Sequence, residues 1–220
     1  MRTEFQQQLQ TLHVELMKMG GLCEEAISLA AKLILGDSEI SPKDIHEVEM
    51  ATDRKEREIE ALCMQILLQQ QPVAGDFRAV SSALKMISDM ERIGDQTDNI
   101  GELAPYLTKC RAQDQVQIGE MARATVQMVT DSVEAFVKSD LPMARRVMQA
   151  DDEVDRLFYD VKEDLIEQIC QRKVDPRASL DLLMAAKYFE RIGDHAVNIA
   201  EWVEYFLTGS HKNQPIPSGA

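Results

Sequence analysis

An internal repeat limits the possible folds of this chain more than any other pattern in its sequence. The segment that begins at Asp76 matches the segment that begins at Asp175 at a constant offset of 99 residues. Twelve of 27 aligned positions are identical, and five of these are consecutive, reading Glu-Arg-Ile-Gly-Asp in both copies. Chance does not produce such a match, so the chain contains two copies of one structural unit.

Each copy of this unit reads as three long helices. Strong helix formers such as Leu, Ala, Met, Glu and Gln are frequent, β-branched runs are nearly absent, and aromatic residues make up only 5% of the chain. Apolar residues recur at helical spacing, and Gly or Pro marks the breaks. The sequence predicts helices over residues 3–35, 41–70, 76–104, 116–138, 139–171 and 175–207.

The predicted fold class is therefore all-α, a tandem repeat of a three-helix unit. The first repeat is expected over residues 1–109 and the second over residues 110–208. A tail rich in Gly, Ser, Asn and Pro follows over residues 209–220, and we expect this tail to be flexible.

The net charge of the chain is −14, from 38 Asp and Glu against 24 Lys and Arg. Nucleic-acid affinity depends largely on Lys and Arg that neutralise phosphates, so a nucleic acid is not an expected partner. A cation or a basic protein surface suits this charge better. The simpler alternative is a solvated surface whose excess charge keeps the protein in solution.

The cysteines are too far apart for a zinc ribbon or a small disulfide scaffold. We expect them to be buried, reduced thiols of a cytosolic protein. The first residues contain no apolar stretch of the signal-peptide type, and no apolar run approaches membrane-spanning length. The expected location is the cytoplasm, with membrane contact only through partners. The cysteines are Cys23, Cys63, Cys110 and Cys170.

Carboxylates that lie four residues apart occur twice in each copy. This spacing puts both members of a pair on one face of a helix, where like charges destabilise the helix by about 0.2–0.5 kcal/mol per pair. A bound cation would offset this repulsion. The pairs are Glu49/Asp53 and Glu91/Asp95 in the first copy, and Asp151/Asp155 and Glu190/Asp194 in the second.

The positions of these pairs suggest that they meet in space. In an antiparallel helix hairpin, residues equidistant from the turn lie side by side. In the first copy the two pairs are equidistant from Pro72, the predicted turn, and in the second they are equidistant from the turn between Cys170 and Asp175. Each copy is therefore expected to place four carboxylates at one level of two neighbouring helices.

Four carboxylates without Cys or His partners suit hard or borderline cations such as Mg, Mn, Ca or Fe, and zinc less well. No Glu stands three residues before a His, so a ferritin-like di-iron site is not expected. The alternative is that these acids are surface charges paired with Lys or Arg. Five further residues could serve as auxiliary ligands, and the alternative is that they are solvated or hydrogen-bonded groups. They are Asp98, Asn99, Glu102, Asn198 and Glu201.

Two repeated residue types beside the acids suggest structural roles. Asp76 and Asp175 stand where helices begin, and we expect each to cap its helix. Gly94 and Gly193 each cost about 1 kcal/mol in the middle of a helix, which suggests close helix packing beside the acids.

The side chains of Arg92 and Arg191 point away from the adjacent Glu, and we expect them to tie neighbouring helices together by salt bridges. His195 follows an acid of the second copy. Gln96 occupies the corresponding position of the first copy, so a surface role is expected for His195.

At this point the motifs resemble those of the PhoU family. The two Glu-Arg-Ile-Gly-Asp segments are similar to the repeated signature of that family. So is the run from Pro72 to Arg78, although Phe77 stands where the family commonly has Leu. The resemblance extends over residues 3–208.

The resemblance implies two antiparallel three-helix bundles related by pseudo-twofold symmetry, in a cytoplasmic protein that is often a homodimer. It implies metal clusters held by the Glu/Asp-x-x-x-Asp motifs, with Fe, Mn, Mg or Zn as the metal. It also implies a role without catalysis. The protein would link the ATPase subunit of a phosphate ABC transporter to a sensor histidine kinase, and keep the phosphate-starvation response off when phosphate is plentiful.

Two other classes of function remain open from the residues. One is a metal-free helical scaffold whose acids form a docking face for a basic partner. The other is a carboxylate–metal enzyme, for which nothing outside the acidic pairs supplies a general base. Titration of metal-free protein with Mg, Mn, Zn and Fe separates the first of these from a metal-binding regulator.

Overall fold

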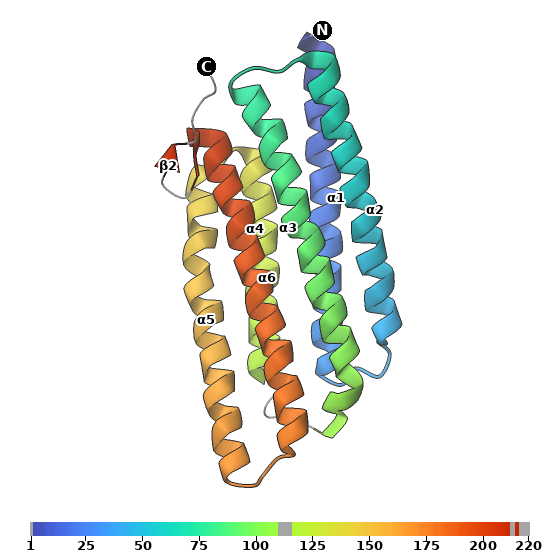
Figure 1. The fold of residues 1–220 in the computed structure, drawn as a ribbon, viewed down its shortest axis with the longest axis vertical. Coiled ribbons are helices and arrows are strands. Elements are labelled where there is room, and N and C mark those ends of the chain that lie inside the picture. Colours follow the sequence, from blue (N-terminus) through green and yellow to red (C-terminus); the bar gives the residue numbers. More distant parts are fainter. Residues whose placement is uncertain (1, 110–115, 212–213, 216–220) are drawn as a thin grey trace.

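In the computed structural model, which describes residues 2–109, 116–211 and 214–215, the described chain contains six α-helices (Figure 1). This architecture confirms the all-α prediction, and each helix end lies within two residues of the expected one. A short 3-10 helix, η1 (Ala104–Lys109), follows the third helix. The helices are α1 (Arg2–Ile34), α2 (Pro42–Gln70), α3 (Gly75–Leu103), α4 (Val116–Lys138), α5 (Leu141–Cys170) and α6 (Pro176–Thr208).

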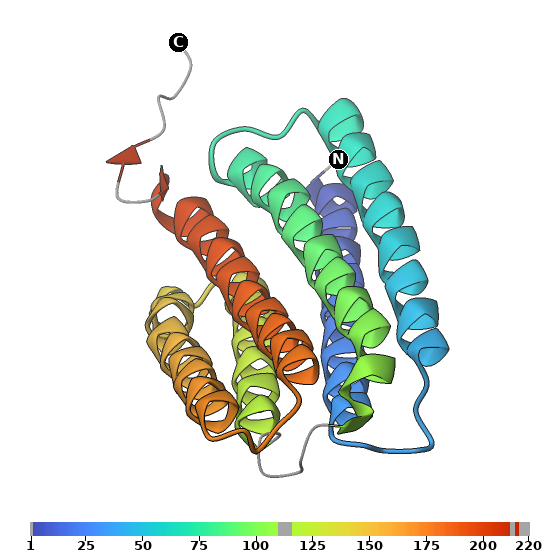
Figure 2. The ribbon, with the colours of Figure 1, turned by 60° about the horizontal axis from the view of Figure 1, so that its bottom comes forward.

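The six helices form two antiparallel three-helix bundles. Helices α1, α2 and α3 pack on one another, and so do α4, α5 and α6. The bundles join through α3 against α6 and through α1 against α4. Figure 2 shows α3 and α6 side by side in front of α1 and α4, with α2 and α5 on the outer flanks. The boundary predicted between residues 109 and 110 borders residues 110–115, which lie outside the described residues.

One hydrophobic core runs through both bundles. Helix α1 contributes Leu12, Leu16, Met19, Cys23 and Ile27, which recur every three or four residues and are fully buried. A large apolar side chain contributes roughly 1.5–3 kcal/mol when it is buried in this way. The continuous core fixes the two bundles, and with them the two hairpins that carry the acidic pairs.

Short polar contacts define where several helices begin. The Asp44 carboxylate accepts hydrogen bonds from the backbone nitrogen and the hydroxyl of Ser41, at 2.7 and 2.6 Å. Asp140 accepts one from the Met143 nitrogen at the start of α5. Asp175 accepts one from the Arg177 nitrogen at 3.1 Å, as predicted for a capping residue.

The capping role predicted for Asp76 is wrong. Ala74 takes a positive φ of 49°, so α3 already begins at Gly75. Asp76 therefore lies in the first turn of the helix and forms no side-chain cap. Its negative charge there interacts favourably with the helix dipole.

The cysteines divide into two environments. Cys23 and Cys63 are buried free thiols, and burial raises the pKa of both to about 12. Cys170, at the end of α5, is exposed, which corrects the prediction that it is buried. Cys110 lies outside the described residues.

The segment expected to be a flexible tail includes a small antiparallel pair of strands, β1 (Ser210–His211) and β2 (Gln214–Pro215). Gly209 ends α6 with a φ of 80°, and the His211 ring stacks on Trp202 with ring centroids 4.0 Å apart. Residues 212–213 and 216–220 lie outside the described residues. None of the described helices combines the length and the apolarity needed to cross a bilayer.

Candidate metal centres

The α2–α3 hairpin brings together the acidic residues predicted for the first repeat. We call Glu49, Asp53, Glu91 and Asp95 the first acidic cluster. Burial and then the charges of Asp53, Asp98 and Asp95 raise the pKa of Glu49. Burial and then the charge of Asp95 raise the pKa of Glu91, with a smaller contribution from Asp53. Carboxylates on both helices therefore interact across the hairpin.

The α5–α6 hairpin forms the corresponding second acidic cluster from Asp151, Asp155, Glu190 and Asp194. Burial, followed by the charges of Asp155, Asp194 and Glu190, raises the pKa of Asp151 from 3.8 to about 6. At neutral pH the folded chain thus holds an ionised Asp151 in unfavourable surroundings.

Asp151 is the best indication of a ligand in the second cluster. Its Oδ1 atom is buried and finds no hydrogen-bond partner among the described residues. A buried polar atom left without a partner costs about 1–3 kcal/mol, and more when it is charged. A cation bound between the four carboxylates would supply the missing partner. The donor set, oxygen atoms only, fits a hard cation.

The repeated glycines make room for these acids. A Cβ atom at Gly193 would lie 3.1 Å from Asp151 Oδ1, closer than an ordinary contact. At Gly94 the nearest atoms would be those of Thr52 at 3.6 Å, with Glu49 Cγ at 3.8 Å. The close packing predicted from the two glycines is confirmed, and it is tighter in the second repeat.

Arginine side chains partly neutralise the first cluster. Arg92 Nη1 lies 2.8 Å from Asp95 Oδ2, and Arg57 Nη2 lies 3.4 Å from Asp53 Oδ2. Arg92 thus pairs within its own helix, which corrects the prediction that it ties neighbouring helices. Arg191, its counterpart, is exposed and forms no ion pair with the residues that the structure describes.

The second cluster has one cationic neighbour of this kind. Lys187 Nζ lies 2.5 Å from Glu190 Oε2, one turn away on α6. In the described part of the chain, neither Asp155 nor Asp194 forms an ion pair, and both residues are exposed. The second cluster therefore retains more uncompensated negative charge than the first.

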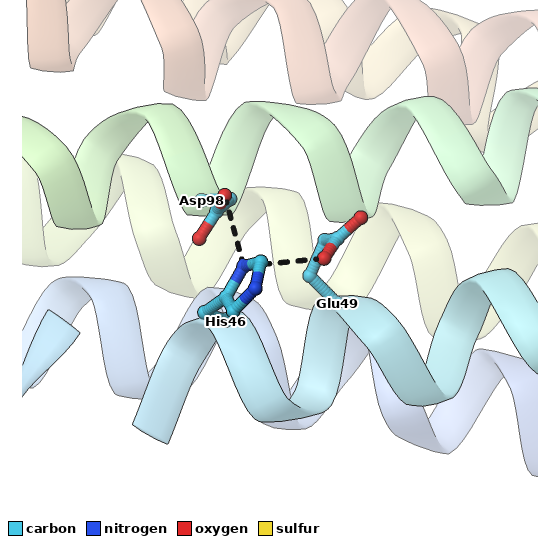
Figure 3. A group of neighbouring side chains, drawn as sticks. All are labelled: His46, Glu49 and Asp98. Atoms are coloured by element: carbon cyan, nitrogen blue, oxygen red, sulfur yellow. Dashed lines mark hydrogen bonds and ion pairs between the residues drawn. The ribbon is translucent and has the colours of Figure 1, made fainter. Parts of the chain in front are cut away.

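His46 is a residue of the first site that the sequence interpretation missed. Its Nδ1 atom lies 3.5 Å from Glu49 Oε2 and 3.3 Å from Asp98 Oδ2 (Figure 3). The prediction that the acids lack His partners is therefore wrong for this repeat. The available signal is a His three residues before Glu49, the reverse of the Glu-before-His order of di-iron proteins.

The auxiliary candidates differ in position. Asp98 lies beside the first acidic cluster, with a carboxylate oxygen within 4.8 Å of one of Glu49. Asn99 donates a hydrogen bond to the backbone oxygen of Asp95, and Asn198 donates one across the bundle interface to Asp89. Of the remaining two, Glu102 is exposed and Glu201 half-buried.

His195 lies at the interface between the bundles, so the surface role expected for it is wrong. Its Nδ1 atom is 2.9 Å from Asp89 Oδ1, and both side chains are only 17% exposed. Asn198 binds the same oxygen at 3.1 Å. This contact links α6 to α3, and it turns the His195 side chain toward Asp89 and not toward the second acidic cluster.

Comparisons with known proteins agree with this architecture. The family model described as PhoU domain matches residues 16–104 and 118–203, one match in each bundle. A phosphate-specific transport system accessory protein PhoU homolog from Pseudomonas aeruginosa is 31% identical over 94% of this chain and 86% of its own length. The accessory protein PhoU of Escherichia coli is 30% identical over 94% and 86%.

Solved structures show the same fold. The crystal structure of PhoU from Pseudomonas aeruginosa has a TM-score of 0.84 and 32% identity, covering 94% of this chain and all of that one. The phosphate transport system regulatory protein PhoU from Streptococcus pneumoniae has a TM-score of 0.85 and 25% identity, covering 94% and 98%. With the family model matched over most of its length and both repeats folded as these structures are, this chain belongs to the PhoU family.

Proposed function

We propose that this protein is a cytoplasmic negative regulator of the phosphate-starvation response. It acts as an adaptor between the ATPase subunit of a phosphate ABC transporter and a sensor histidine kinase, and thereby modulates phosphate uptake. The observation that carries this proposal is the match of both bundles to the PhoU domain. The names of the relatives, which are phosphate-specific transport system accessory proteins, support it.

The adaptor is proposed to work without catalysis, as a homodimer that holds its partners in one state. Two bundles on a common core present separate helical faces, which suits the simultaneous binding of two proteins. A regulator of this kind shifts an equilibrium only by binding one state of its partner more tightly than the other.

The acidic clusters are proposed to bind metal ions that stabilise these faces. The buried, unpaired Oδ1 atom of Asp151 supports this role, as do the raised pKa values of Glu49 and Glu91. Fe, Mn, Mg and Zn are the candidate metals. Bound ions would supply positive charge, and the four carboxylates of each cluster would hold them.

A metal-free scaffold with an acidic docking face is the second candidate. The observation in its favour is that Arg57 and Arg92 already pair with two acids of the first cluster. Under this alternative, metal-stripped protein binds its partners as well as metal-loaded protein does. Under our proposal, removal of the metal weakens partner binding.

A deletion strain tests the regulatory role. With phosphate in excess, a reporter for phosphate-starvation genes should be silent in the parent strain and active in the strain that lacks this protein. Expression of the wild-type chain from a plasmid should silence the reporter again. A silent reporter in a clean deletion would show that another protein performs this function.

A further inference from the structure

We propose that His46, Glu49 and Asp98 form a nitrogen-containing cation site, so that the first repeat prefers zinc-type borderline cations while the second repeat binds hard cations only. We call these three residues the histidine site. This inference rests on the metal-binding part of the proposed function and adds to it a difference in metal preference between the repeats.

The three side chains converge from two rigid helices. His46 and Glu49 are three residues apart on α2, so they lie on one face of that helix. Asp98 reaches them from α3 (Figure 3). The ligand atoms of all three lie within 4.8 Å of one another. Groups held by helices keep their geometry better than groups on loops, which favours a defined coordination site.

The two separations from the His46 nitrogen match those between ligands of one ion, and the shorter one also meets the geometry of a long hydrogen bond. Two atoms bound to a tetrahedral ion at 2.0–2.2 Å lie about 3.3–3.6 Å apart. His46 Nδ1 lies 3.3 Å from Asp98 Oδ2 and 3.5 Å from Glu49 Oε2. A protonated imidazole that donated to a carboxylate would come closer, to about 2.7–2.9 Å.

Glu49 supplies an independent indication of a missing partner. Its side chain is only 12% exposed, and its Oε2 atom is buried without a hydrogen-bond partner in the described part of the chain. Oε2 is also the atom that faces His46. His46 is 56% exposed, so an ion can enter from solvent on that side. A cation between the two would satisfy the buried oxygen.

The second repeat lacks this site. The offset that relates Glu49 to Asp151 places Met148 opposite His46, and the offset of the Glu-Arg-Ile-Gly-Asp motifs places Val197 opposite Asp98. Met148 and Val197 are partly buried and pack against the hydrophobic core. The second cluster therefore offers oxygen ligands only.

Ligand chemistry converts this difference into metal preference. Imidazole suits Zn, Fe, Ni and Cu, whereas carboxylates alone suit Mg, Ca and Mn. We expect the histidine site to take a zinc-type ion through one nitrogen and two oxygens. Mn²⁺ should distinguish the two repeats far less than Zn²⁺ does.

The test titrates the full-length, metal-stripped protein with Zn²⁺ and, separately, with Mn²⁺ by calorimetry. The variants His46→Met and Asp98→Val give the first repeat the residues of the second. His13→Gln, on α1 beside Phe136, is the control for loss of a histidine elsewhere. Circular dichroism verifies that each variant keeps the helical content of the wild type.

The expected result is that His46→Met weakens zinc binding at one site per chain by at least about tenfold, as expected for loss of a direct ligand. Its manganese affinity should stay within about twofold of the wild type, and His13→Gln should bind both ions like the wild type. Asp98→Val should weaken zinc binding in the same direction.

Unchanged zinc affinity in His46→Met would overturn the histidine site. If Asp194→Asn lost manganese in the same experiments, the metal-binding part of the proposed function would still stand. A wild-type chain that binds neither ion would overturn both, and the reporter strain would then decide the regulatory role alone.

Discussion

The two acidic clusters carry the same Glu-Arg-Ile-Gly-Asp motif and yet differ in charge balance. In the first, Arg92 pairs with Asp95, and His46 lies beside Asp98. In the second, Asp151 is half-buried, and its burial followed by the neighbouring like charges raises its pKa to about 6. The comparison teaches that a repeated motif places carboxylates but leaves their electrostatics to the surrounding residues.

Those surrounding residues differ between the repeats at a few positions. Arg57, which pairs with Asp53, corresponds to Tyr159 in the second repeat. Lys187, which pairs with Glu190, corresponds to Ser88 in the first. Because these exchanges lie outside the motif, the two clusters are expected to respond differently to metal, pH and substitution.

The largest expected effect is loss of metal from one repeat at a time. Asp95→Asn should weaken cation binding in the first cluster, and Asp194→Asn in the second, each by about tenfold or more because a charged ligand is lost. Binding of a cation only to the folded chain stabilises it by about 2.7 kcal/mol at a hundredfold excess over the dissociation constant. The shift of the unfolding midpoint by metal measures this.

Glu60→Gln is the control for these two variants, because Glu60 is exposed on α2 outside the clusters. It should bind metal like the wild type. Full metal content in both Asp95→Asn and Asp194→Asn would show that the clusters are solvated charge.

The next effect concerns the folding stability of the metal-free protein. Asp151→Asn removes a charge that folding buries, so it should raise the free energy of unfolding at pH 7 by about 1 kcal/mol, after allowance for solvent screening. Glu49→Gln should raise it less, because His46 offsets part of the charge around Glu49. Urea unfolding of chelator-treated protein measures both changes.

The pH dependence of this effect has a definite sign. Folding raises the pKa of Asp151 from 3.8 to about 6, so the folded chain binds more protons than the unfolded chain between these values. The destabilisation is fully present above pH 6 and disappears as the pH falls toward 4. The stability difference between Asp151→Asn and the wild type should shrink in that window. A difference that stays constant would contradict the burial of this charge.

A smaller difference should separate the two glycines. Replacement of a mid-helix Gly by Ala gains up to about 1 kcal/mol of helix propensity. Gly94→Ala should realise about half of this or more, because its Cβ meets only ordinary contacts. Gly193→Ala should not, because its Cβ would lie 3.1 Å from Asp151 Oδ1. Unfolding free energies measure the contrast.

Gly21→Ala is the matched control for these glycine variants, since nothing lies within 4 Å of its added Cβ. It should be stabilised as Gly94→Ala is. Equal stabilisation of all three variants would mean that Gly193 and Asp151 do not restrict each other.

The smallest effect is expected at Lys187. Lys187→Ser gives the second repeat the residue of the first and removes the pair with Glu190, which should cost about 0.2–1 kcal/mol of stability. The cost should shrink in 1 M salt, which screens the pair. Lys85→Ser is the comparison, because exposed Lys85 forms no ion pair with any described residue. An equal loss in both variants would show that the pair contributes nothing.

The helices and the meeting of the acidic pairs could be predicted from the sequence because local signals determine them. Pro42, Pro142 and Pro176 each stand in the first turn of a helix, which fixes its start. Positions equidistant from Pro72 lie side by side because antiparallel helices of equal pitch, α2 and α3, lie on either side of the turn. Such regularities need no knowledge of the tertiary structure.

The remaining site residues depend on contacts that the helical period does not reveal. Arg92 pairs with Asp95, one turn along its own helix, and not with an acid on a neighbouring helix. His195 contacts Asp89 on α3, and this contact forms only because the two bundles pack against each other. His46 precedes Glu49 by three residues in the sequence, but only the fold brings Asp98 to it from another helix.

The contact of His211 with Trp202 allows the position of the strand pair after α6 to be followed by fluorescence. Trp202 is the single tryptophan of this protein, and the His211 ring stacks on it at 4.0 Å. Indole fluorescence is sensitive to a stacked imidazole, and most strongly to its protonated form. One spectroscopic signal, with no label attached, therefore reports whether the strand pair after α6 is seated on the second bundle or has been displaced from it.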